Sequence, residues 1–242
     1  MKTTLEPKSA VRRKSSIRKV RSDGVEHVAR QPTQTRSLER YEKIIQAIEE
    51  LLKISNIEDI SFYDVARQAD ISPASVNYHF PTTAALRIVL TERYMRSASE
   101  KLFEVIREMV ALRNDKWQYW LLKMGQAAVD YYNQNRHISE VILGPTSHRA
   151  ASFATIGENE RIARIVLEGL KRVFILPEIP DLPKKIMIAI EVADALWSRA
   201  YMANGHIDDH ILQEAVHIQI LYLRSILPEC LSLLPEARIE TD

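Results

Sequence analysis

The stretch 69–80, which reads Ala-Asp-Ile-Ser-Pro-Ala-Ser-Val-Asn-Tyr-His-Phe, constrains the fold of this chain more than any other. Its first residues predict a tight corner. Ser72 followed by Pro73 is typical of a helix start. The serine side chain caps free amides, and proline has no N–H group at a position where that group would have no partner within the helix. Pro81 disfavours the helical conformation at Phe80 and so ends this helix. We therefore expect a corner followed by a helix of about two turns.

Helical patterns flank this stretch on both sides. Residues 38–54 place apolar side chains at three- and four-residue spacing, which predicts an amphipathic helix. Asn56 is expected to close it, since asparagine tolerates the left-handed conformation. A second short helix is expected from Ser61, with Asp64 at the capping-box position, and a long fourth helix over about 82–109. Two short helices joined by a corner and packed on the first helix form a helix-turn-helix unit.

Composition favours helices in the rest of the chain. Six glycines in 242 residues are too few for the many tight turns of a sandwich, a barrel or a doubly wound sheet. No segment alternates convincingly as a strand would, and there is no internal repeat. The sequence therefore predicts an all-α fold. The further helices are expected over 117–133, 157–174, 184–203 and 208–227.

Charge is distributed unevenly along the chain. The formal net charge is +1, but residues 1–40 carry eleven Lys and Arg against four acids, a net charge of +7. The remainder carries −6, so the basic arm over 1–36 would meet a polyanionic partner rather than the body. A terminal tail that only aids solubility is the alternative interpretation.

The cysteine count and the hydropathy indicate the cell compartment in which the protein is expected. Cys230 is the single cysteine, which excludes an intramolecular disulfide and a cysteine-based zinc site and fits a reducing cytoplasm. No apolar run approaches the length of a membrane span, and no apolar segment follows the basic N-terminus. We expect a soluble, cytoplasmic protein with no membrane partner.

Two clusters resemble chemical sites but have simpler explanations. His206 and His210 have the spacing of metal ligands on a helix, yet Asp208 beside them is a normal helix cap, so we predict no metal and no cofactor. Glu191 and Asp194 could form an acid pair for catalysis, but a solvated or dimer-edge face explains them better. The sequence has no glycine-rich phosphate loop and no nucleophile elbow, so we predict no enzyme.

The exposed helix after the corner is suited to reading DNA. The major groove admits one helix, and an asparagine such as Asn77 can bond an adenine edge in bidentate fashion. A compact helical unit that binds no DNA is the alternative, which the preceding basic arm disfavours. The expected DNA contacts are Arg36, Arg40, Ser61, Tyr63, Ser72, Pro73, Ala74, Ser75, Asn77, Tyr78, His79, Thr82 and Thr83.

Residues 40–90 resemble the DNA-binding domain of the TetR family of transcriptional regulators. The matching residues are Ile44-Ile45-Gln46-Ala47, Leu51-Leu52, Ile60-Ser61, Asp64-Val65-Ala66, Ala69-Asp70-Ile71-Ser72, Val76-Asn77-Tyr78-His79-Phe80 and Ala85-Leu86. Asp70 and Asn56 stand where the family usually has glycine, and both residue types tolerate positive φ. Asn77 replaces a frequent tyrosine, and Thr83 replaces a usual lysine, which removes one expected phosphate contact.

The resemblance implies the organisation and function of the whole chain. It implies an arm over 1–36 that we expect to be disordered, a DNA-binding domain over 37–90, and a helical effector-binding and dimerisation domain over 91–242, linked by the long fourth helix. It implies a homodimeric repressor that binds a palindromic operator in double-stranded DNA and is released by a small-molecule effector of unknown identity. The alternative is a DNA-bound architectural or cell-division factor of the same fold that recruits a protein partner.

The C-terminal helices supply candidates for the effector pocket and the dimer interface. Aromatic residues beyond 110 predict a pocket for a flat or lipophilic effector, with ordinary core packing as the alternative. The expected ligand contacts are Trp117, Trp120, Gln126, Asp130, His137, Trp197 and Tyr201. The resemblance assigns apolar stripes on the last two long helices to a dimer interface, although a core within one chain fits their spacing equally well. The stripes are Ile186, Ile190, Ala193, Trp197, Ile211, Ala215, Ile218 and Tyr222.

Removing residues 1–36 is expected to flatten the salt dependence of DNA binding. Residues 41–90 carry four Lys and Arg against seven acids, so the arm must supply the attraction to phosphate. The measurement is the slope of the logarithm of the binding constant against the logarithm of salt concentration, for both chains on one duplex. An unchanged slope would show that the arm takes no part.

Overall fold

Helices make up nearly all of the described structure, which confirms the all-α prediction. The computed structural model describes residues 29–30, 35–145 and 149–235, so most of the predicted arm lies outside the described residues. The elements are α1 (Thr35–Leu52), the 3-10 helix η1 (Ile57–Asp59), α2 (Phe62–Ala69), α3 (Pro73–His79), α4 (Thr83–Leu112), α5 (Trp117–Gln134), α6 (Arg136–Ile142), α7 (Arg149–Lys171), β1 (Phe174–Ile175), α8 (Leu182–Asn204), α9 (Asp209–Arg224) and β2 (Ser232–Leu233).

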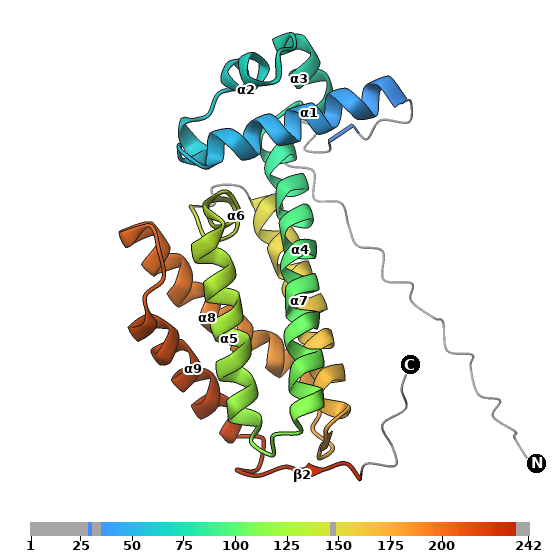
Figure 1. The fold of residues 1–242 in the computed structure, drawn as a ribbon, viewed down its shortest axis with the longest axis vertical. Coiled ribbons are helices and arrows are strands. Elements are labelled where there is room, and N and C mark those ends of the chain that lie inside the picture. The colour runs from blue at the N-terminus through green and yellow to red at the C-terminus, as the bar shows by residue number, and fades with distance from the viewer. Residues whose placement is uncertain (1–28, 31–34, 146–148, 236–242) are drawn as a thin grey trace, which may run out of the picture.

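The first three helices form a small unit at one end of the molecule, and α4 runs from it into a larger body (Figure 1). Apolar side chains from all three helices fill the centre of this unit, where Ile44, Ile45, Val65, Val76 and Phe80 are fully buried. Burying one such aliphatic side chain stabilises a fold by about 1.5–3 kcal/mol, so this small core can hold α3 in place on α1.

Local caps fix the ends of the short helices as the sequence predicts. The Ser61 hydroxyl accepts a hydrogen bond from the Asp64 amide, and the Asp64 carboxylate accepts one from the Ser61 amide at 3.1 Å. Asp70 closes α2 in the left-handed conformation, with φ 53°. The Ser72 hydroxyl then caps α3, where Pro73 takes the first position. The corner and both caps are therefore confirmed.

The end of α1 differs from the expectation. Asn56 is extended, with φ −77°, and does not close the helix in a left-handed turn. Arg136 on α6 instead donates hydrogen bonds to the carbonyl oxygens of Leu52 and Ser55, at 2.9 and 3.1 Å. A side chain more than 80 residues away therefore satisfies the free carbonyls of α1. The helix α6 itself falls where we expected only a break.

The body packs α4, α5, α7, α8 and α9 around apolar cores (Figure 1). Gly125 lets α5 approach α9 closely, since a Cβ atom there would lie 3.2 Å from both Leu212 and Val216. The helix α7 starts at Arg149 rather than at the expected Gly157, which lies inside it. No described helix is long and apolar enough to cross a membrane. Near the far end, β1 and β2 form a two-residue antiparallel pair that the sequence does not predict.

A buried carboxylate joins the small unit to the body. Glu140 on α6 is 4% exposed. One of its oxygens accepts a hydrogen bond from the Ile57 amide at 3.0 Å, and the other accepts one from the Tyr201 hydroxyl of α8 at 2.8 Å. Nearby, the buried Arg87 guanidinium of α4 donates to the Val141 carbonyl oxygen at 3.1 Å. Glu140 thus connects the segment after α1 to the body.

Replacing Glu140 with alanine is expected to lower the free energy of unfolding by about 3 kcal/mol. The change leaves the Ile57 amide and the Tyr201 hydroxyl without their acceptor, and an unpaired buried polar group costs about 1–3 kcal/mol. Urea unfolding followed by circular dichroism measures this loss. Tyr201→Phe, which removes one of the two hydrogen bonds, should cost about 1 kcal/mol. Equal and small losses for both variants would contradict the role of Glu140.

Candidate functional site

The short helix α3 presents a polar face to solvent. Asn77 is exposed, and its side-chain amide donates to the Pro73 carbonyl oxygen at 3.1 Å. Tyr78 is 57% exposed on α3, and Tyr63 is 74% exposed on α2. Ala74 is also exposed on α3. The helices α2 and α3 lie at the end of the molecule away from the body, so a long partner can reach this face (Figure 1).

His79 does not belong to this exposed face. It is 2% exposed, its ring meets the Tyr41 ring edge-on at 5.7 Å, and its Nδ1 lies 3.4 Å from the Arg30 carbonyl oxygen. The expectation that His79 contacts DNA is therefore wrong, because the last turn of α3 points this side chain into the small core. The residue instead holds Arg30 beside α3, since the Arg30 amide donates to the His79 carbonyl oxygen at 2.9 Å.

Basic side chains surround α3. The Arg30 guanidinium lies 5.3 Å from the centre of the Tyr78 ring. Near the start of α3, Arg36, Arg40 and Lys43 line a polar hollow of about 450 Å³, together with two acids and with Ser72 and Ser75. The structure thus brings the expected Arg36 and Arg40 next to the start of α3. Lys43 was missed, although its spacing along the first helix places it on the face of Arg36 and Arg40.

Four of the remaining expected DNA contacts lie at or near helix ends. The Ser61 hydroxyl pairs with Asp64, and Thr82 accepts a hydrogen bond from the Ala85 amide at 3.1 Å, so both hydroxyls act as caps. Thr83 is exposed at the first position of α4, and Pro73 is half-buried at that of α3. Two of these four side chains are therefore engaged in capping.

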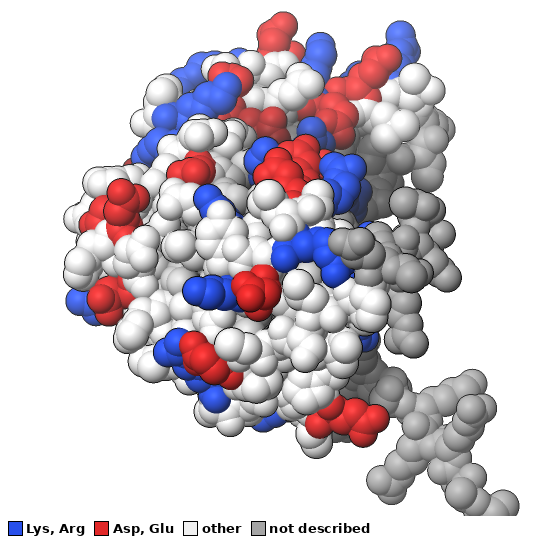
Figure 2. Space-filling model, turned by 60° about the horizontal axis from the view of Figure 1, so that its bottom comes forward, with Lys and Arg blue, Asp and Glu red and all other residues white. Residues whose placement is uncertain are grey.

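The body gives no comparable concentration of positive charge on the face shown in Figure 2. Lys and Arg side chains lie there among Asp and Glu side chains. Several basic side chains of the described body are paired with acids, as in Lys101 with Glu104 and Lys171 with Glu168. This face would therefore attract a polyanion weakly.

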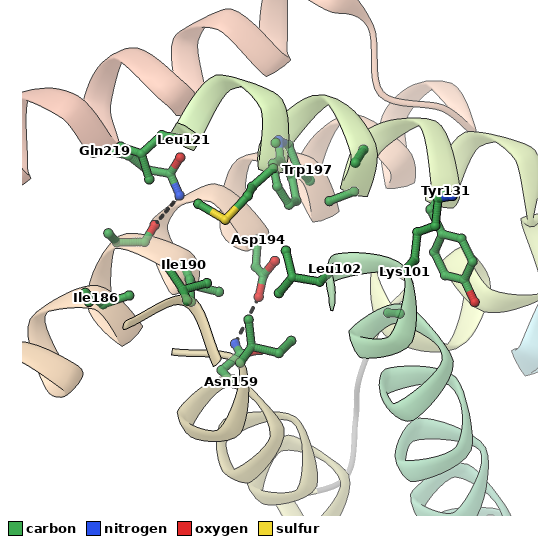
Figure 3. Close-up of a pocket in the computed structure, with 18 of the residues that line it drawn as sticks. Lys101, Leu102, Leu121, Tyr131, Asn159, Ile186, Ile190, Asp194, Trp197 and Gln219 are labelled. Carbon is green, nitrogen blue, oxygen red and sulfur yellow. Dashed lines mark hydrogen bonds between the residues drawn. The ribbon is translucent and has the colours of Figure 1, made fainter. Parts of the chain in front are cut away.

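A cavity of about 110 Å³ lies within the body between α4, α5, α7, α8 and α9 (Figure 3). Its wall is mostly apolar, with aromatic rings from Tyr131, Tyr132 and Trp197. The aliphatic part of the wall consists of Met95, Ala98, Leu102, Leu121, Met124, Ala127, Ala128, Ile162, Val166, Ile186, Ala189, Ile190 and Leu223. Such a wall suits a lipophilic ligand.

Of the seven expected ligand contacts, Trp197 lines this cavity. Trp117 and Trp120 are buried in a separate core, where the Trp117 ring nitrogen donates to the Pro228 carbonyl oxygen at 2.9 Å and Trp120 meets Phe174 at 5.7 Å. The other four have partners elsewhere: Gln126 with Asp130, His137 with Tyr94, and Tyr201 with Glu140. Helical spacing identifies aromatic residues, but it does not say which of two cores each one enters.

The polar side chains of Lys101, Asn159, Asp194 and Gln219 interrupt the apolar wall. The Asn159 amide of α7 donates to the Asp194 carboxylate of α8 at 2.9 Å (Figure 3). Burial raises the pKa of Asp194 to about 6, and Glu191 acts in the same direction, while the hydrogen bond from Asn159 opposes them. The expectation of a solvated face is therefore wrong for Asp194, because α8 turns this carboxylate toward the cavity.

The stripes expected at the dimer interface lie largely inside one copy of the chain. Ile186, Ala193, Trp197 and Ala215 are buried within it, so they pack between its own helices rather than between two copies. Ile190, Ile211 and Tyr222 are half-buried. Ile218, on α9, is 38% exposed and keeps surface available to a second copy. The opposite faces of α8 and α9 also expose the apolar Met202 and Leu221.

The histidines near the start of α9 lie beside a helix cap. Asp208 accepts a hydrogen bond from the Ile211 amide at 2.8 Å and caps α9, as expected. The His206 ring lies 3.1 Å from the Asn204 carbonyl oxygen, and His210 is exposed. Among the residues that the structure describes, no three His, Cys, Asp or Glu side chains gather as metal ligands would.

The chain has the fold of solved TetR-family transcriptional regulators. One of these, from Streptomyces coelicolor, is 21% identical, with 78% of this chain and 99% of that chain covered and a TM-score of 0.59. The fatty acid degradation regulator FadR from Bacillus halodurans is 12% identical, with 81% and 98% covered and a TM-score of 0.56. SmeT, the repressor of the Stenotrophomonas maltophilia multidrug efflux pump SmeDEF, is 12% identical, with 79% and 90% covered and a TM-score of 0.52. No protein-family model matches the chain, and no curated protein matches it in sequence.

Asp194→Asn is expected to raise the free energy of unfolding at pH 7.5 by about 1–2 kcal/mol. The folded state raises the pKa of Asp194 from 3.8 to about 6, so between about pH 4 and 6 it holds a proton that the unfolded state releases. Stability from this group therefore falls as pH rises through that range and is lowest above it. Asparagine keeps the shape and removes the charge.

Chemical denaturation of both chains from pH 4 to pH 8 checks this prediction. The difference between them should be largest at pH 7.5 and should vanish near pH 4. Asp130→Asn is the matched control, because it removes one carboxylate from an exposed position on α5 outside the cavity. A variant at Asp194 that is less stable at pH 7.5 would contradict the desolvation argument.

Proposed function

We propose that this chain is a sequence-specific DNA-binding transcriptional regulator, a homodimeric repressor that a small molecule releases from a palindromic operator. The observation that carries the proposal is the exposed polar face of α3, with Arg30 beside Tyr78 near its end and with Arg36, Arg40 and Lys43 near its start. The fold shared with solved regulators supports it. The apolar cavity in the body favours a ligand-responsive regulator over an architectural factor that recruits a protein.

Side-chain chemistry suggests which residues contact bases and which contact phosphate. Asn77 on the outer face of α3 can bond an adenine edge, while Ala74 and Ser75 are small enough to meet a thymine methyl group or a base edge. Arg36, Arg40 and Lys43 would contact phosphate, which fixes the position of α3 without reading sequence. Such charges compensate for the lysine that Thr83 replaces.

Dimerisation is proposed through the outer faces of α8 and α9. Met202, Ile218 and Leu221 are exposed apolar residues there, and Ala195 is exposed on α8 with a side chain small enough for close helix approach. A symmetric pair would place two copies of α3 on half-sites about 34 Å apart, one turn of DNA. The proposed interface thus differs from the stripes expected from the sequence.

The contacts of α8 suggest how a ligand would reach the DNA-binding unit. Trp197 lines the cavity, and Tyr201, one helical turn further along α8, donates to Glu140 at 2.8 Å. Glu140 in turn accepts the Ile57 amide after α1. A ligand that shifts α8 would move this chain of contacts and change the spacing of the two α3 helices, which lowers affinity for the operator.

We propose that the arm ends earlier than residue 36. Thr35 and Arg36 belong to α1, and Arg30 is held against α3. The segment whose removal tests the arm is therefore 1–28, with eight Lys and Arg against three acids.

Asn77→Ala is expected to weaken binding to the cognate site by about 1–3 kcal/mol with little change on random DNA, because it removes a contact to a base rather than to phosphate. Gln134→Ala, at an exposed position at the end of α5, is the matched control and should bind as the unchanged chain does. The site comes from selecting bound sequences out of a random duplex library, and fluorescence anisotropy then measures both affinities. Equal losses on both DNAs would assign Asn77 to packing or to phosphate.

The selection itself tests the proposed function. A palindrome with half-sites about one turn apart is the expected result. Binding that enriches no motif would overturn sequence-specific regulation and favour an architectural role.

A further inference from the structure

The cavity combines an apolar wall with unused hydrogen-bond acceptors. Asn159 is 3% exposed. Its side-chain amide group donates a hydrogen bond to Asp194, and its Oδ1 has no hydrogen-bond partner among the described residues. The orientation of this amide is fixed, because the reverse would set two oxygens against each other. Both residues line one cavity, and Asp194 presents its carboxylate there, whereas the Asn159 Oδ1 has almost no exposed surface.

The negative charge of Asp194 has no positive partner. Among the residues that the structure describes, no Lys, Arg or His forms an ion pair with it. Lys101 lines the cavity, but its ammonium group pairs with Glu104 at 2.7 Å. Glu191 lies on the same helix and adds negative charge. Buried charges in proteins are normally paired, so an uncompensated carboxylate beside an apolar cavity indicates a missing cation.

We infer that the cavity binds a small lipophilic cation, whose protonated amine lies against the Asp194 carboxylate while its hydrocarbon part contacts the apolar wall. This inference deepens the proposed function, because it names the ligand class of the same cavity. The volume of about 110 Å³ limits the size. A cavity of about 150 Å³ holds benzene, so the hydrocarbon part that enters this smaller cavity is a chain of a few carbons.

The energetics favour a cation over an anion or a neutral molecule of equal size. Folding has already removed most water from Asp194, so an amine loses only its own hydration on binding. An ammonium group has three donors and can donate to a free lone pair of the Asp194 carboxylate. The rings of Tyr131, Tyr132 and Trp197 line the same cavity, and aromatic rings attract cations. A carboxylate ligand would instead meet the like charge of Asp194.

Three probes with the same butyl group test the inference: butylamine, butan-1-ol and pentanoate, which are cationic, neutral and anionic at pH 7.5. Isothermal titration calorimetry measures each of them on the full chain without DNA. The variants are Asp194→Asn, which keeps the shape and removes the charge, and Asp130→Asn, which removes a charge outside the cavity. Circular dichroism checks that both variants are folded.

The amine is expected to bind at least about tenfold more tightly than the alcohol, equivalent to 1.4 kcal/mol, and the carboxylate most weakly. Asp194→Asn should abolish this advantage and leave the alcohol unchanged, whereas Asp130→Asn should alter nothing. Three results would overturn the inference. They are tighter binding of the anionic probe than of the amine, an amine affinity that Asp194→Asn leaves unchanged, and no saturable binding of any probe. Amine binding that leaves operator affinity unchanged would retain the inference and contradict ligand release, so the two failures are distinguishable.

Discussion

The two parts of this molecule depend on one buried carboxylate. Glu140 accepts hydrogen bonds from the Ile57 amide of the segment after α1 and from the Tyr201 hydroxyl of α8. Since a buried acceptor of this kind is costly to leave unmatched, the small unit and the body hold a defined relative position. Arg136 adds to this, because it closes the end of α1 from the same short helix α6. A movement of Tyr201 on α8 would therefore alter the contact between Glu140 and the segment after α1.

Local sequence signals predicted the parts of the fold whose causes are local. Ser61, Asp70 and Ser72 cap or close their helices through groups within five residues, and these assignments are confirmed. The prediction for Asn56 is wrong because the distant Arg136 supplies the hydrogen bonds at the end of α1 that a left-handed turn would have supplied. The prediction for His79 is wrong because the orientation of α3 on the small core decides which of its side chains face solvent. Both failures reflect tertiary contacts, which a pattern of residue types does not contain.

The cavity shows the same limit more strongly. Aromatic residues on α5 and α8 indicated a lipophilic site, yet Trp117 and Trp120 joined a second core and only Trp197 reached the cavity. Asp194 was placed on a solvated face because its spacing from Glu191 fits one. The signal that could have identified it is its position three residues before Trp197, which places both on one face of the helix. Polar residues inside an apolar helical face deserve the functional interpretation first.

The cost that Asp194 imposes on the folded chain is itself an argument about function. A carboxylate that burial holds at a raised pKa lowers stability at neutral pH, and asparagine would fit beside Asn159 without that cost. Residues that destabilise a fold without a structural gain are typical of binding sites, where stability is exchanged for a ligand contact. A fold does not by itself choose a ligand, because binding depends on the side chains of the site. In this chain, the choice rests on the charge of one side chain in the cavity wall.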